Sequence, residues 1–84
     1  MGKFKLTITK KAQKEFLELP EKILSRFDQQ VKRLRDNPYP EGCVKLSGSK
    51  NTYRIREGDY RLIYAIEEKE IVVMTVKHRR EVYR

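Results

Sequence analysis

The chain has 84 residues, enough for a single domain, residues 1–84, with a small hydrophobic core. It holds 20 Lys and Arg against 12 Asp and Glu, a formal net charge of +8, and this excess favours an anionic partner. A single cysteine excludes an internal disulfide, and no apolar run reaches the length of a signal sequence or a membrane span. We therefore expect a soluble, cytoplasmic protein with no membrane contact.

The first half of the chain predicts one strand and two helices. Apolar residues alternate with polar ones over residues 4–8, as in a strand with one buried face. Helical spacing follows, first from Thr9, a suitable N-cap, to Pro20, and then from Pro20, which suits the first position of a second helix, to Leu34. Prolines and a glycine in residues 37–42 end the helical pattern. The two helices should form a hairpin.

The second half of the chain predicts strands only. Residues 44–46 read as a short strand, residues 52–66 as a hairpin, and residues 71–78 as a last strand inside the sheet, because they are apolar at nearly every position. This order predicts an α+β fold, with a two-helix hairpin packed on one face of a mostly antiparallel sheet of about four strands.

The hairpin carries three arginines on one side. Gly58-Asp59 fits a two-residue loop, and this loop sets the register. The predicted pairs are Glu57 with Tyr60, Arg56 with Arg61, Ile55 with Leu62, Arg54 with Ile63, and Tyr53 with Tyr64. One face is then apolar and the other carries Arg54, Arg56 and Arg61. Like charges directly opposite each other cost stability, so these arginines are either solvated or hold an anion such as phosphate.

The last strand should bring a histidine to the same face. If Glu67 pairs with Glu70, His78 falls beside Asp59 among the arginines, where it can titrate near neutrality. The other pairs of this register are Ile63 with Met74 and Arg61 with Val76. We expect the far end of this face to be an uncovered apolar patch, which usually marks an interface. Its residues are Ile63, Ala65, Val72 and Met74.

No cofactor or metal site is indicated. One histidine, one cysteine and scattered carboxylates do not form a ligand set, and there is no glycine-rich phosphate loop. We expect chemistry carried by the side chains alone.

Three segments, residues 45–48, 53–64 and 76–83, resemble the RelE branch of the RelE/ParE toxin superfamily. The resemblance covers nearly the whole chain. It implies a RelE-like fold and a toxin of a toxin–antitoxin pair that enters the ribosomal A site and cuts mRNA. This mRNA interferase would be a metal-independent endoribonuclease, in which the 2′-hydroxyl attacks the adjacent phosphate and leaves a 2′,3′-cyclic phosphate. The implied partners are the ribosome, mRNA and a cognate antitoxin with an acidic and apolar segment, with operator DNA bound only through the antitoxin.

The resemblance also implies catalytic residues. By motif position, the catalytic and phosphate-binding groups fall at Arg54, Arg56, Arg61, Arg79 or Arg80, and Tyr83. The family's best-known members carry lysine where this chain has Arg54 and Arg56, and one of those lysines is a proposed general base. Arginine is effectively never deprotonated, so proton removal falls to His78, Tyr83 or an rRNA group.

Two other functions fit the sequence. One is a toxin of the ParE branch, which inhibits gyrase by binding it and cuts nothing. The other is a non-enzymatic basic RNA-binding module, which the composition alone permits. His78 and Tyr83 near three arginines favour the nuclease.

Overall fold

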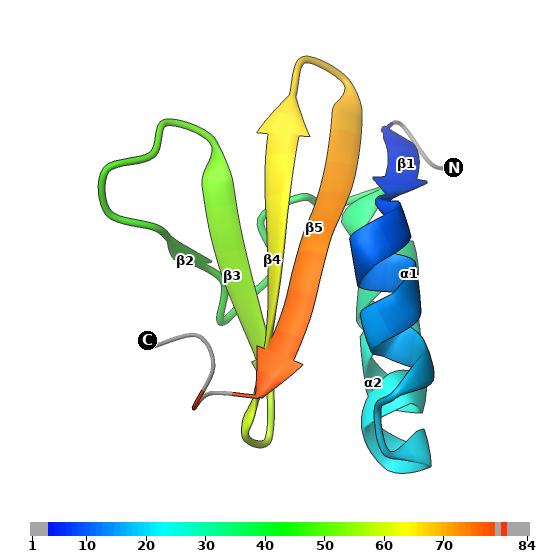
Figure 1. Ribbon diagram of the computed structural model, residues 1–84. Helices are drawn as coiled ribbons and strands as arrows, with labels where there is room; N and C mark the ends of the chain where they lie inside the picture. The colour runs from blue at the N-terminus through cyan, green and yellow to red at the C-terminus, as the bar shows by residue number, and fades with distance from the viewer. Residues whose placement is uncertain (1–3, 79, 81–84) are drawn as a thin grey trace.

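A computed structural model describes residues 4–78 and residue 80 of the chain (Figure 1). Two helices follow the first strand, and four strands follow the helices. The elements are β1 (Lys5–Ile8), α1 (Lys10–Leu17), α2 (Glu21–Leu34), β2 (Val44–Lys45), β3 (Thr52–Glu57), β4 (Tyr60–Glu67) and β5 (Glu70–His78). In this part of the chain, no helix has the length and apolar character that crossing a membrane requires.

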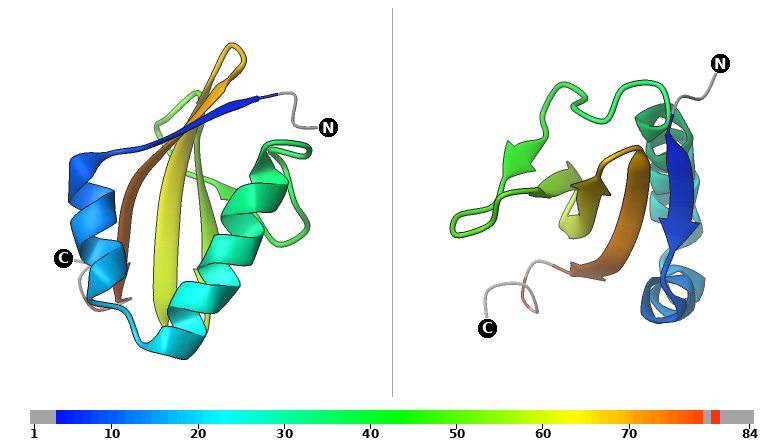
Figure 2. Two further views of the ribbon diagram at one scale, coloured as in Figure 1. Left: turned by 90° about the vertical axis from the view of Figure 1, so that its right-hand side faces the viewer. Right: turned by 90° about the horizontal axis from the view of Figure 1, so that it is seen from above.

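The two helices begin where the sequence indicates. Thr9 caps α1, because its side chain accepts a hydrogen bond from the Ala12 backbone N at 3.1 Å. Pro20 is the N-cap of α2 rather than its first residue, a shift of one position. The helices form the predicted hairpin, and both lie on the same face of the sheet (Figure 2).

The sheet has five strands in the order β1-β5-β4-β3-β2. β1 pairs with β5 in parallel, and the other pairs are antiparallel. The prediction of an α+β fold with a mostly antiparallel sheet is confirmed, with one strand more than the expected number. The short strand predicted at residues 44–46 is β2, which pairs with Tyr53 and Arg54 at the edge of the sheet, so all five segments predicted as strands join it.

One face of the sheet forms the core with the helices. Its fully buried side chains come from the centres of β3, β4 and β5, and α2 contributes Phe27, Val31 and Leu34. The strand residues are Ile55, Leu62, Tyr64, Ile71, Val73 and Val76. Within residues 4–78, no helix covers the opposite face, which we call the open face (Figure 2). The arginines of the hairpin lie on this open face.

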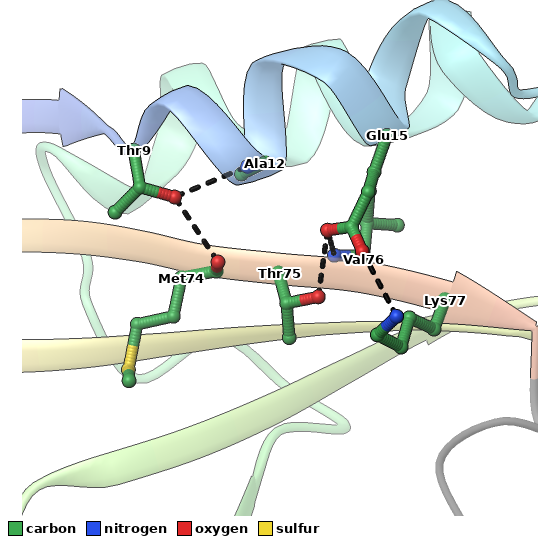
Figure 3. A network of polar contacts seen from close by, with 7 residues as sticks. All are labelled: Thr9, Ala12, Glu15, Met74, Thr75, Val76 and Lys77. Atoms are coloured by element: carbon green, nitrogen blue, oxygen red, sulfur yellow. Dashed lines mark hydrogen bonds and ion pairs between the residues drawn. The ribbon is translucent and has the colours of Figure 1, made fainter.

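Helix α1 takes the place of β1 along the edge of β5. β1 ends at Ile8, opposite Val73, so the rest of β5 has no strand on that side. The side chain of Thr9 donates a hydrogen bond to the backbone oxygen of Met74 at 3.1 Å, and α1 then runs beside β5 (Figure 3). The helix therefore covers a strand edge that would otherwise leave backbone groups unpaired.

Glu15 of α1 binds three consecutive residues of β5 (Figure 3). Its Oε1 accepts hydrogen bonds from Thr75 Oγ1 at 2.6 Å and from Val76 N at 3.1 Å, and its Oε2 lies 3.1 Å from Lys77 Nζ. Burial raises the pKa of Glu15, but the hydrogen bonds from Thr75 and Val76 and the Lys77 charge outweigh it, so the pKa is lowered overall. This carboxylate fixes the last residues of β5 to α1.

Candidate functional site

The predicted hairpin register is confirmed for every pair. Arg56 lies opposite Arg61 and Arg54 lies opposite Ile63, so the three arginines share the open face. Gly58 has φ +59° in the loop, a left-handed conformation that glycine adopts without steric cost. The loop residue thus sets which face of the sheet receives the arginines.

These arginines differ in exposure. Arg56 is exposed, Arg54 is half-buried, and Arg61 is only 5% exposed. Arg61 Nη1 lies 3.4 Å from Tyr60 O and 3.5 Å from Gly58 O, which makes both hydrogen bonds long. Within the described part of the chain, the buried Nε atoms of Arg54 and Arg61 have no hydrogen-bond partner. A buried charged group in this state is costly, and an anion that accepts from it removes the cost.

No ion pair within residues 4–78 joins a carboxylate to these three arginines. The pairs there are Arg26 with Glu57, Lys32 with Asp28, and Lys77 with Glu15. Arg56 is exposed and therefore available to a negatively charged ligand on the open face, whereas Arg61 and the Nε atom of Arg54 are buried.

The predicted position of His78 is wrong. Glu67 does pair with Glu70, but a β-bulge interrupts the register at Met74, so that Ile63 faces Thr75. Beyond the bulge, Arg61 faces Lys77 rather than Val76, and Tyr60 faces His78. Because one extra residue reverses the alternation, His78 lies on the helix-covered face, across the sheet from the arginines.

His78 sits in a small cavity at the end of β5. Its ring meets Tyr60 edge to face, with the ring centroids 5.2 Å apart. Its Nδ1 accepts a hydrogen bond from the backbone N of Arg80 at 3.3 Å. Glu15 and Glu18 line the same cavity, of about 240 Å³. Since His78 does not share a face with the arginines, its position does not favour it as the general base.

The bulge brings a residue to the arginines that the sequence reasoning missed. Lys77 lies opposite Arg61, which lies opposite Arg56, so three cationic residues form one row across β3, β4 and β5. We call these three residues the cationic row. The sequence carried little signal of the bulge, because residues 71–76 are apolar at nearly every position. In the structure, buried Val73 and Val76 are three residues apart, where period 2 requires two or four.

Two predicted site residues, Arg79 and Tyr83, lie outside the described residues. Arg80 is described and exposed, and its backbone N contacts His78. In the described part of the chain, no group of three His, Cys, Asp or Glu side chains could hold a metal ion.

The open face also carries the expected apolar patch, hollowed into a groove of about 510 Å³. Met74, 42% exposed, projects there at the bulge. The groove is lined by Thr9, Lys11, Asn51, Thr52, Ala65, Glu67, Val72, Met74 and Thr75. Three of the four predicted patch residues line it, and Ile63 does not.

The fold and the cationic row define a small α+β protein with a cationic open face. The profile of the family described as "ParE toxin of type II toxin-antitoxin system, parDE" matches residues 6–83. The chain belongs to the RelE/ParE superfamily, the toxins of type II toxin–antitoxin systems.

Individual relatives support this assignment. The chain is 29% identical to the putative toxin RelE1 of Methanocaldococcus jannaschii over 98% of the chain and 97% of that protein. It is 31% identical to a chain of the archaeal RelE-RelB complex from Pyrococcus horikoshii, with a TM-score of 0.80 over 92% of this chain and 96% of that chain. The isolated E. coli RelE toxin is 29% identical, with a TM-score of 0.78 over 95% of this chain and 90% of that chain.

Proposed function

We propose that this toxin is an endoribonuclease that cleaves ribosome-bound mRNA. The observation that carries the proposal is the cationic row on the open face, with buried arginine donors that have no partner among the described residues. Guanidinium groups bind phosphate through paired N–H donors and neutralise the charge that builds up during phosphoryl transfer. The likeness to RelE proteins supports the same function.

The reaction requires no co-reactant. The 2′-oxygen of the substrate forms a bond to the adjacent phosphorus, the bond from phosphorus to the 5′-oxygen breaks, and a 2′,3′-cyclic phosphate and a 5′-hydroxyl result. Arg54, Arg56 and Arg61 bind the phosphate and stabilise its pentacovalent transition state. Lys77 lies at the β5 end of the row, with its Nζ 3.1 Å from Glu15 Oε2.

Two protons must move in this reaction, one from the 2′-hydroxyl and one to the leaving 5′-oxygen. The arginines cannot accept the first. We propose Tyr83 or an rRNA group as the base, with Arg79 or Arg80 near the phosphate. His78 then has a positioning role, through the hydrogen bond that its Nδ1 accepts from the backbone N of Arg80.

The test follows mRNA cleavage in a purified translation reaction. The wild-type chain should cut ribosome-bound mRNA, and Arg61→Ala should lose about a hundredfold or more of the single-turnover rate, as expected for removal of one transition-state donor. Arg35→Ala is the matched control, since Arg35 is an exposed arginine at the end of α2. Equal rates for the two variants would contradict the site, and intact mRNA with the wild-type chain would contradict the function.

A second candidate function is inhibition of gyrase. The observation that favours it is the family profile, which is that of ParE. Inducing the chain in cells and following amino-acid and thymidine incorporation separates the two, because an mRNA nuclease halts the first and a gyrase inhibitor the second.

We further propose a cognate antitoxin as partner. Complexes of related toxins with RelB, such as the one from Pyrococcus horikoshii, support this. The groove around Met74 would receive apolar side chains of the antitoxin, and the neighbouring cationic row would attract its acidic residues.

A further inference from the structure

Besides the apolar groove around Met74, a second groove, lined mostly by polar residues, lies outside the open face, between α2 and the second half of β3. It encloses about 570 Å³. β2 pairs with Tyr53 and Arg54, and among the described residues no strand neighbours the outer edge of β3 beyond Arg54, so the groove opens along this edge. Its lining residues are Arg26, Gln29, Gln30, Arg33, Pro40, Glu41, Gly42, Ile55, Arg56 and Glu57.

Helix α2 presents a row of donors to this groove. Gln29 and Gln30 lie three and four residues after Arg26 and four and three residues before Arg33, which places these side chains on one side of the helix over about 10 Å. Arg26, Gln29 and Arg33 are exposed. Their side chains offer planar sets of N–H donors, which suit phosphate oxygens.

Two carboxylates, Glu41 and Glu57, also line the groove, and within residues 4–78 only Glu57 forms an ion pair with a groove arginine. Glu57 accepts a hydrogen bond from Gln30 Nε2 and lies 3.9 Å from Arg26 Nη1, so one acid is already occupied by two residues of the helix. Within residues 4–78, no ion pair engages Arg33 or Arg56. Arg33 and Arg56 thus remain for a ligand, and Arg26, whose side chain is 61% exposed and lies 3.9 Å from Glu57, can exchange this weak pair for a phosphate.

Arg56 connects this groove to the cationic row. It belongs to the row that crosses the open face, and it also lines the groove at the strand edge. A chain with regularly spaced negative charges can therefore pass from Arg61 over Arg56 to Arg33 without leaving cationic surface.

We propose that the groove binds the phosphate backbone of single-stranded RNA next to the segment held on the open face. This inference rests on the proposed function, since it extends the path of the same substrate. It makes α2 a binding element as well as a core element, and it assigns Arg33 and Arg26 as phosphate ligands that take no part in the chemistry.

The test measures binding to an oligouridylate with 2′-O-methyl groups, which cannot supply the attacking hydroxyl, as a function of salt. Each lost phosphate contact should reduce the slope of log affinity on log salt by roughly 0.7. Arg33→Ala should lose about one such step and Arg26→Ala/Arg33→Ala roughly twice as much. Lys32→Ala is the matched control, because Lys32 lies on the same helix, pairs with Asp28 and does not line the groove.

A further variant, which should increase rather than decrease RNA affinity, strengthens the test. Glu57→Gln can still accept a hydrogen bond from Gln30 but frees Arg26, so RNA should bind more tightly and with a steeper slope. The inference would be overturned if Arg26→Ala/Arg33→Ala bound RNA with the same affinity and the same salt slope as Lys32→Ala. So would a loss of antitoxin affinity with RNA affinity unchanged, which would make the groove a protein surface. Because this readout needs no cleavage, it is independent of whether the chain cuts mRNA.

Discussion

Arg61 is a charged residue that is buried at a cost to the fold. It is 5% exposed, lies opposite another arginine, and has an Nε without a partner among the described residues. Each of these features costs stability in the free protein. A residue that costs stability at a buried position of a small domain is accounted for by a function that needs it there.

We therefore expect Arg61→Leu to be more stable and inactive. An apolar side chain removes the repulsion from Arg56 and the unsatisfied donor, a gain of about 1 kcal/mol in the free energy of unfolding. Urea unfolding of the free chain measures the gain, and mRNA cleavage measures the loss. A variant less stable than the wild type would show that the guanidinium stabilises the fold.

The pH dependence of cleavage by His78→Ala distinguishes whether His78 is a general base or a positioning residue. Because it lies across the sheet from the arginines, we expect His78→Ala to keep the shape of the pH–rate profile, with any loss of rate uniform over pH. A general base would instead contribute about 10² to 10⁴ in rate and its removal would flatten the acidic limb. Single-turnover cleavage across pH decides between them, with Tyr83→Phe measured alongside.

At the scale of elements, α1 holds β5 through one carboxylate. The pKa of Glu15 is lower in the fold than in the unfolded chain, so its contribution to stability is fully present above the ordinary pKa of a glutamate and is lost as the pH falls through the lowered value. Glu15→Gln should therefore be less stable at neutral pH and lose less stability between neutral and acidic pH. Thermal unfolding over this range, with Glu18→Gln as control, measures the difference. Parallel curves for Glu15→Gln and wild type would contradict the role.

Periodicity predicted the elements well and failed at one irregularity. The helix hairpin, the strands and the β3–β4 register followed from local patterns, because Gly58 and the alternating residues around it are adjacent in sequence. The bulge at Met74 depends on how β5 meets α1 and β4 at once, and the nearly continuous apolar pattern of residues 71–78 conceals it. Because of this single extra residue, Lys77 lies on the open face where His78 was predicted.

At the scale of the whole molecule, the apolar groove and the cationic row lie on the same face. An antitoxin segment covering both should depend on Met74, so Met74→Lys should weaken binding of the cognate antitoxin by about 1–2 kcal/mol. Leu17→Lys is the control, since Leu17 is 83% exposed on α1, outside the groove. Isothermal titration measures both. An effect at Leu17 alone would place the antitoxin on the helices.

The parallel pairing of β1 with β5 has a consequence for synthesis. β1 finds its partner only in the segment that begins at Glu70, and the same segment supplies Lys77 to the cationic row. A nascent chain that has not yet reached β5 therefore has an unpaired first strand and an incomplete site, and this long-range contact forms late. A fragment released before Glu70 is made lacks both the partner of β1 and Lys77 and, with its first strand unpaired, is a substrate for proteases. Synthesis therefore has to pass β5 before the fold and the cationic row are complete.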